Sequence, residues 1–80
     1  MDYADIVHRI RDLTVLEHAL ERAHVGEGLS SDELERLHAT EVALDQCWDL
    51  LRQRRARRKA GQDPGEATVR SERVVETYEQ

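Results

Sequence analysis

The chain has 80 residues, of which 39% are hydrophobic and 36% charged, and its formal net charge is −5. A chain of this length forms one thin-cored domain, residues 1–80, and its composition favours long amphipathic helices. The lone cysteine excludes an internal disulfide, and no apolar run approaches the roughly 20 residues of a membrane span. The first residues are charged at positions 2, 5, 9, 11 and 12, so we expect no apolar region of the kind that a signal peptide contains. We therefore expect a soluble cytoplasmic protein without a membrane partner.

The first segment is predicted to be a helix over residues 3–25. Asp2 is a suitable N-cap, and Gly26 allows the left-handed conformation that ends many helices. The helix is indicated by apolar residues that recur at helical spacing, namely Tyr3, Ile6, Ile10, Leu13, Leu16, Leu20 and Ala23.

The second helix is predicted over residues 31–60. Ser30 and Glu33 form an S-x-x-E capping box at its start, and Gly61 ends it. Because the connection between the helices is short, they should pack as an antiparallel hairpin. Its predicted contact line, spaced by three and four residues, is Leu34, Leu37, Glu41, Leu44, Trp48, Leu51, Arg55 and Arg58. Trp48 is expected to be the main packing anchor.

Residues 61–80 are predicted to form a turn and a docked or semi-ordered tail. Asp63 is expected to cap a short helical turn that starts at Pro64, with Glu66 closing the box. The residues after Glu66 are rich in β-branched side chains and show no clear period. The predicted fold class is therefore all-α: an antiparallel two-helix hairpin with a C-terminal turn and tail, which pairs into a four-helix bundle.

A run of six cationic residues extends past the start of the first helix and is called the basic tract. Residues 26–51 carry a net charge of −6 and residues 52–59 one of +6. The first hypothesis is that the tract is a solvated helix end, balanced by Asp2, Asp5 and the acidic tail. The second is that it pairs with acidic residues of a second copy, Asp45 and Asp49 included. The tract consists of Arg52, Arg54, Arg55, Arg57, Arg58 and Lys59.

A third hypothesis is weak binding of nucleic-acid phosphates by the basic tract. Against it, the rest of the chain carries a net charge of −11. Steps of 100° per residue also point the basic side chains all around the helix, and no aromatic residue is interleaved with them to stack on bases.

Other candidate sites are weaker. Two E-x-x-H spacings, Glu21/His24 and Glu35/His38, match a pattern that holds metal ions in helical bundles, but both pairs lie at the solvent-exposed loop end. Cys47 is expected to be a buried, unreactive thiol. We find no catalytic motif, phosphate-binding loop or cysteine cluster, so we predict no catalytic residue, cofactor or resident metal and no enzyme.

The run LDQCWDLLRQRRARRKAGQDPGEATVR, residues 44–70, resembles the signature of a small uncharacterised actinobacterial family, a domain of unknown function. The first helix, from Asp2 to Ile10, loosely matches the family's D-x-x-I-x-x-R-I start, and Val75, Glu76 and Tyr78 match its V-E-x-Y-like tail. The resemblance implies an actinobacterial cytoplasmic protein whose tail belongs to the folded unit. It implies no activity.

The functional prediction is a non-enzymatic helical interaction or structural module that forms a homodimer or binds a protein partner. It follows from apolar residues that lie off the predicted contact line and need cover from the tail or from a second chain. Those residues are Val7, Val15, Ala19, Val42, Ala43 and Leu50. The packing or interface candidates are Leu44, Trp48, Leu51, Leu50 and Val42.

Overall fold

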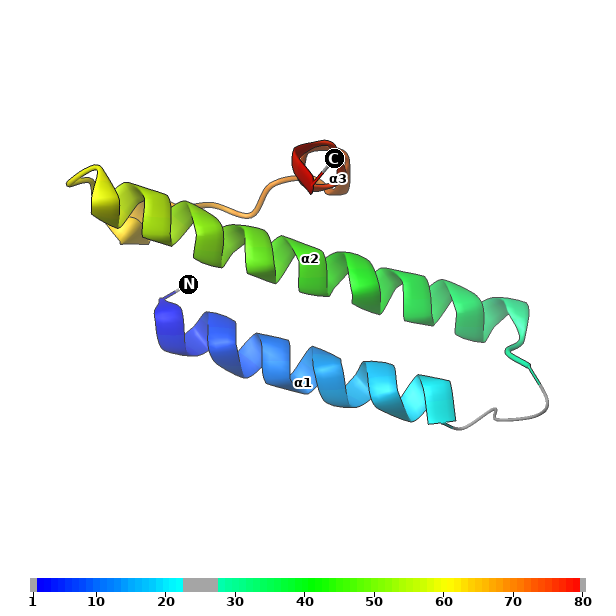
Figure 1. Cartoon of the computed structure of the whole chain (residues 1–80). Coiled ribbons are helices and arrows are strands. Elements are labelled where there is room, and N and C mark those ends of the chain that lie inside the picture. The colour runs from blue at the N-terminus through cyan, green and yellow to red at the C-terminus, as the bar shows by residue number, and fades with distance from the viewer. Residues whose placement is uncertain (1, 23–27, 80) are drawn as a thin grey trace.

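The computed structural model describes residues 2–22 and 28–79, the last four of them by their backbone only. Within these ranges it contains no strand, and its helices are α1 (Tyr3–Arg22), α2 (Ser31–Lys59), the 3-10 helix η1 (Pro64–Glu66) and α3 (Glu72–Glu79). Figure 1 shows α1 and α2 side by side and antiparallel, with α3 on the other side of α2. The predicted all-α hairpin is confirmed.

The start of α1 is capped as predicted. The Asp2 carboxylate accepts a hydrogen bond from the Asp5 backbone N–H at 2.8 Å. This bond lowers the pKa of Asp2, and the nearby Arg54 charge lowers it further. The predicted last residues of this helix, 23–25, and its stop at Gly26 lie outside the described residues.

Both ends of α2 follow from local sequence. Ser30 Oγ accepts from the Glu33 backbone N–H at 3.2 Å, and the Glu33 carboxylate accepts from the Ser30 N–H at 3.1 Å, so the capping box is confirmed. The helix ends at Lys59, one residue earlier than predicted, with Gly61 at φ +74°. The N–H groups of Gly61 and Gln62 donate to the carbonyls of Arg58 and Arg57, which satisfies the last turn.

Residues 62–71, called the return segment, lead from the end of α2 back along its side. Asp63 caps η1 as predicted, since its carboxylate accepts from the Gly65 N–H at 2.8 Å. Glu66 does not close the expected box. Its carboxylate lies 3.5 Å from Nη1 of Arg57, because an ion pair with a neighbouring guanidinium is available to it.

The tail is more regular than predicted, because residues 72–79 form the helix α3. Its axis runs across α2 in Figure 1, and among the described residues it contacts α2 and not α1. Val75 is 1% exposed and lies beside Val42 and Asp45 of α2. Burial of this side chain outweighs the weak helix propensity of the β-branched residues around it.

The buried side of α2 differs from the predicted contact line. Thr40 and Cys47 are buried, whereas Glu41 and Trp48, each one residue further on, are exposed. The hydroxyl of Thr40 can be buried because it donates to the Arg36 carbonyl at 2.7 Å. The buried side of α2 differs from the predicted contact line because α2 packs against α1 on one side and against the return segment on another. The resulting core consists of Ile6, Leu13, Leu44, Cys47, Leu50 and Ala67.

Candidate interaction face

One face of the hairpin keeps aromatic side chains exposed. Tyr3 is 58% exposed, Trp48 48% and Val7 42%. The prediction that Trp48 is the main packing anchor is wrong. The buried side of α2 contains Cys47 instead, which leaves Trp48 at the edge of the α1–α2 contact. The α2 residues that bind the return segment, such as Gln46 and Gln53, lie on the other side of the helix. This face is therefore left uncovered by the residues that the structure describes.

This open face extends over both long helices. At 100° per residue, Glu41, Trp48 and Arg55 lie on one line of α2, because they are seven residues apart. On α1, Glu17 follows Tyr3 by fourteen residues and Glu21 follows Val7 by the same interval, so these four side chains also share one side. The open face is defined as Tyr3, Val7, Glu17, Glu21, Glu41, Trp48, Arg55 and Arg58.

The basic end of the open face contains a depression of about 590 Å³. Tyr3 of α1 and Trp48 of α2 line it, together with arginines from the last turns of α2. Arg55 and Arg58 are exposed there, and neither forms an ion pair with another residue that the structure describes. The full lining is Tyr3, Trp48, Leu51, Arg54, Arg55 and Arg58.

Most of the other residues of the basic tract contact residues of the same chain. Arg57 pairs with Glu66 at 3.5 Å, and Arg54 Nη1 donates to the Pro64 carbonyl at 3.3 Å. Arg52 lies 3.9 Å from the carboxylate of Asp49. Lys59 is exposed. These contacts favour the first hypothesis for part of the tract and leave Arg55 and Arg58 to be explained.

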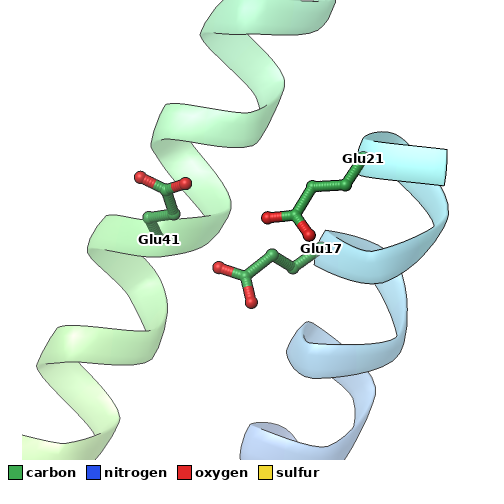
Figure 2. A group of neighbouring side chains, drawn as sticks. All are labelled: Glu17, Glu21 and Glu41. Carbon is green, nitrogen blue, oxygen red and sulfur yellow. The ribbon is translucent and has the colours of Figure 1, made fainter. Parts of the chain in front are cut away.

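The acidic end of the open face brings three carboxylates together. Figure 2 shows Glu17 and Glu21 of α1 pointing toward Glu41 of α2, and one oxygen of each lies within 4.8 Å of the others. Oxygen ligands of this kind can hold a divalent cation, and an arginine of another chain can neutralise them equally well.

The predicted E-x-x-H pairs are not the residues that gather there. Glu21 joins Glu17 and Glu41, whereas Glu35 and His38 are not in that group. His38 Nε2 instead lies 3.4 Å from Glu72 of α3, on the other side of α2 from α1. His24 lies outside the described residues, so its pairing stays untested.

The second hypothesis for the basic tract required Asp49 to be accessible to a second chain. The structure shows that it is not accessible. Its side chain has no exposed surface, and Arg70 donates to its two carboxylate oxygens at 2.7 and 2.9 Å. Burial alone would raise the pKa of Asp49, but the hydrogen bonds from Arg70 and Gln53, with the charges of Arg70 and Arg52, leave that pKa below its usual value. Asp45 is half-buried beside α3.

The remaining predicted interface candidates divide between core and edge. Leu44 is 8% exposed and Leu50 3%, so both are core residues. Val42 is half-buried under α3, and Leu51 is half-buried at the depression. Of the five candidates, only Trp48 belongs to the open face, and Leu51 lines the depression at its basic end.

Cys47 is buried, as expected for an unreactive thiol. It is 6% exposed, and burial raises the pKa of its thiol, although the nearby Arg9 charge opposes the rise. The charge that affects this thiol is thus a guanidinium of α1 and not the neighbouring aspartates.

No helix among the described residues is long and apolar enough to cross a membrane. The family described as "Protein of unknown function (DUF2630)" matches residues 2–80. The "Uncharacterized protein Rv0898c" of Mycobacterium tuberculosis and the "Uncharacterized protein Mb0922c" of Mycobacterium bovis are each 49% identical over 76 residues. The alignment covers 94% of this chain and 87% of each relative. No solved structure matches the chain.

Proposed function

The chain belongs to the DUF2630 family of proteins of unknown function, and we propose that it is a non-enzymatic helical interaction module of the cytoplasm. Its open face binds a protein surface, either that of a second copy or that of another protein. The uncharacterised mycobacterial relatives are consistent with the actinobacterial family that residues 44–70 suggested, and they attach no activity to it.

The exposure of Trp48 carries this proposal. A tryptophan that is 48% exposed, next to a tyrosine that is 58% exposed, leaves a large apolar area in water. Aromatic residues are enriched at protein interfaces, and exposed apolar patches rimmed by charge are typical of contact sites. The acidic and basic ends of the open face form such a rim around Trp48 and Val7.

The titratable groups support a non-enzymatic role. The lowered pKa of Asp49 is explained by its structural ion pair with Arg70, and that of Asp2 by its cap at the start of α1. The thiol of Cys47 has a raised pKa, which is the reverse of what a nucleophile needs. A lone buried thiol also fits a reducing cytoplasm.

Size-exclusion chromatography with light scattering, from about 1 to about 100 µM, tests the proposal. We expect a mass of twice 9.3 kDa at the upper concentrations, and the monomer mass for Trp48→Ser. Val15→Ser is the matched control, because Val15 is 62% exposed but lies on the far side of α1 from Leu13. Should the chain be monomeric, capture from a host lysate must depend on Trp48. A monomer without such capture contradicts the proposal.

A second candidate is binding of single-stranded nucleic acid. The observation that favours it is the depression in which Tyr3 and Trp48 lie beside arginines, because guanidiniums bind phosphate and aromatic rings stack on bases. It predicts retardation of a generic RNA at low salt, lost in R55A/R58A and kept in the matched charge control R11A/R22A. Equal retardation of both variants contradicts it.

A further inference from the structure

We propose that the partner of the open face is a second copy of this chain, bound antiparallel about a two-fold axis close to Trp48. The acidic end of each copy then meets the basic end of the other. This inference rests on the proposed function, since it names the partner of the same face.

The spacing along α2 makes the open face self-complementary. Glu41 precedes Trp48 by seven residues and Arg55 follows it by seven. At 1.5 Å per residue each lies about 10 Å along the helix from the tryptophan. A two-fold axis through Trp48 and perpendicular to α2 therefore places Glu41 of each copy opposite Arg55 of the other, with the two indoles at the centre.

The first helix adds carboxylates to the acidic end of the open face and the uncharged Tyr3 and Val7 to the rest of it. Glu17 and Glu21 lie level with Glu41, since their carboxylate oxygens are within 4.8 Å of one another. Tyr3 lies level with Arg55 and Arg58, because they line one depression. The two-fold axis thus sets a group of three carboxylates against a group of arginines at both ends of the interface.

Electrostatics favour this partner over a solvated monomer. Three carboxylates so close together repel one another, and none of them forms an ion pair within the described residues. Arg55 and Arg58 are likewise without an ion pair there. The antiparallel dimer gives both groups their counter-charges from one contact, and complementary charges of this kind fix orientation and register.

The same charges exclude a parallel pairing through the open face. Two copies placed side by side in the same direction would set Glu41 against Glu41 and Arg55 against Arg55. Juxtaposed like charges disfavour an interface strongly. The polarity of the open face therefore selects the antiparallel dimer, whose four long helices form a bundle.

A pair of charge-reversed variants tests this arrangement. The acid variant is E21R/E41R and the base variant is R55E/R58E; all four positions are exposed. Each variant alone places like charges at both ends of its homodimer, and we expect its dimer dissociation constant to rise at least about tenfold. An equimolar mixture restores opposite charges at both ends, so a heterodimer should form with near wild-type affinity.

Controls and readouts keep the outcomes distinct. D12R and E35R reverse charges on other sides of α1 and α2, and both positions are exposed, so these variants should leave the dimer unchanged. Circular dichroism reports that each variant is folded. A monomeric wild type that binds a host protein through Trp48 overturns this inference but not the proposed function. If the wild type is a dimer but neither charge-reversed variant has a higher dissociation constant, the antiparallel register alone is overturned. The same holds if the mixture of the two variants stays monomeric.

Discussion

The carboxylate of Asp49, which has no exposed surface, is held by Arg70 through two hydrogen bonds of 2.7 and 2.9 Å. The two residues are 21 positions apart, and their ion pair fastens the return segment to the middle of α2. Gln53 strengthens the junction, because its amide donates to Asp49 at 2.9 Å and to the Thr68 carbonyl at 2.6 Å. The return segment is therefore held by a polar network around the buried carboxylate of Asp49 as well as by the burial of Ala67.

Breaking this ion pair should destabilise the protein strongly. Arg70→Ala leaves a buried carboxylate without its main counter-charge, and we expect a loss of about 3–5 kcal/mol in the free energy of unfolding. Urea denaturation followed by circular dichroism measures it. Replacing both partners, as D49L/R70M, should recover most of the loss, because no buried charge then remains. Arg11→Ala is the exposed control, and a loss in R70A no larger than in this control contradicts the prediction.

The stability should also depend on pH through Asp49. Its pKa in the folded chain lies below the ordinary value of 3.8, so the unfolded chain binds this proton more tightly. The stabilising contribution is therefore complete above about pH 5 and is lost as the pH falls below 3.8 and through the folded-state pKa.

Urea midpoints measured between about pH 2.5 and about pH 7 check this dependence. D49N should be less stable at neutral pH, and its stability should fall less steeply on acidification than that of the wild type. Because Asp2 keeps its own lowered pKa in both proteins, the difference between the two curves reports Asp49. Parallel curves for the two proteins would refute the assignment.

Local sequence predicted the two long helices and several helix caps, because a cap depends on residues within one turn. Ser30 with Glu33 and Asp63 with Pro64 are examples, as is the stop at Gly61. The Asp49–Arg70 pair has no such local signal, since the chain contains 12 lysine and arginine residues and each of them is a formal partner for Asp49. The burial of a carboxylate thus depends on the path of the return segment.

The open face was only partly predictable for a related reason. A spacing of three and four residues identifies a stripe on α2, but the buried arc is set by both neighbours of that helix. Once α1 and the return segment cover Leu44 and Leu50, Trp48 lies outside the covered arc. The basic tract is recognisable from composition alone. Only the three-dimensional structure shows that Arg57 pairs with Glu66 of the same chain, whereas Arg55 lines the depression on the open face.

The core and the open face should respond differently to truncation. Leu50 is 3% exposed in the cluster that joins α1, α2 and Ala67, so Leu50→Ala should cost about 2–5 kcal/mol. Trp48→Ser should cost less than Leu50→Ala at concentrations where the chain is monomeric, because about half of the Trp48 side chain is exposed and its removal opens onto solvent instead of leaving a closed cavity. Urea denaturation at low micromolar concentration measures both. Equal losses would mean that Trp48 is a core residue after all.

The end of α2 should depend on the backbone of Gly61. Its φ of +74° is a conformation that other L-residues adopt only with strain, and no neighbouring atom lies within 4 Å of the position that a Cβ would take there. Gly61→Ala should therefore cost about 1 kcal/mol through the backbone alone. Gly61→Asn should cost less, because asparagine tolerates this region better. Thermal unfolding ranks the three proteins, and an alanine variant as stable as the wild type would contradict the strain.

The thiol of Cys47 should report how firmly the return segment is held. It lies 6% exposed in the core cluster with Ala67, and burial raises its pKa, so the folded chain should react slowly with a disulfide reagent at mildly alkaline pH. Arg70→Ala weakens the hold on the segment that contains Ala67. We therefore expect the thiol to react at least about tenfold faster in this variant at concentrations of urea too low to unfold it, since local opening exposes the sulfur. Arg11→Ser is the control and should leave the rate unchanged. A rate in R70A equal to that of the wild type would mean that α1 and α2 alone shield Cys47, and that the ion pair with Asp49 orders the return segment without closing the core.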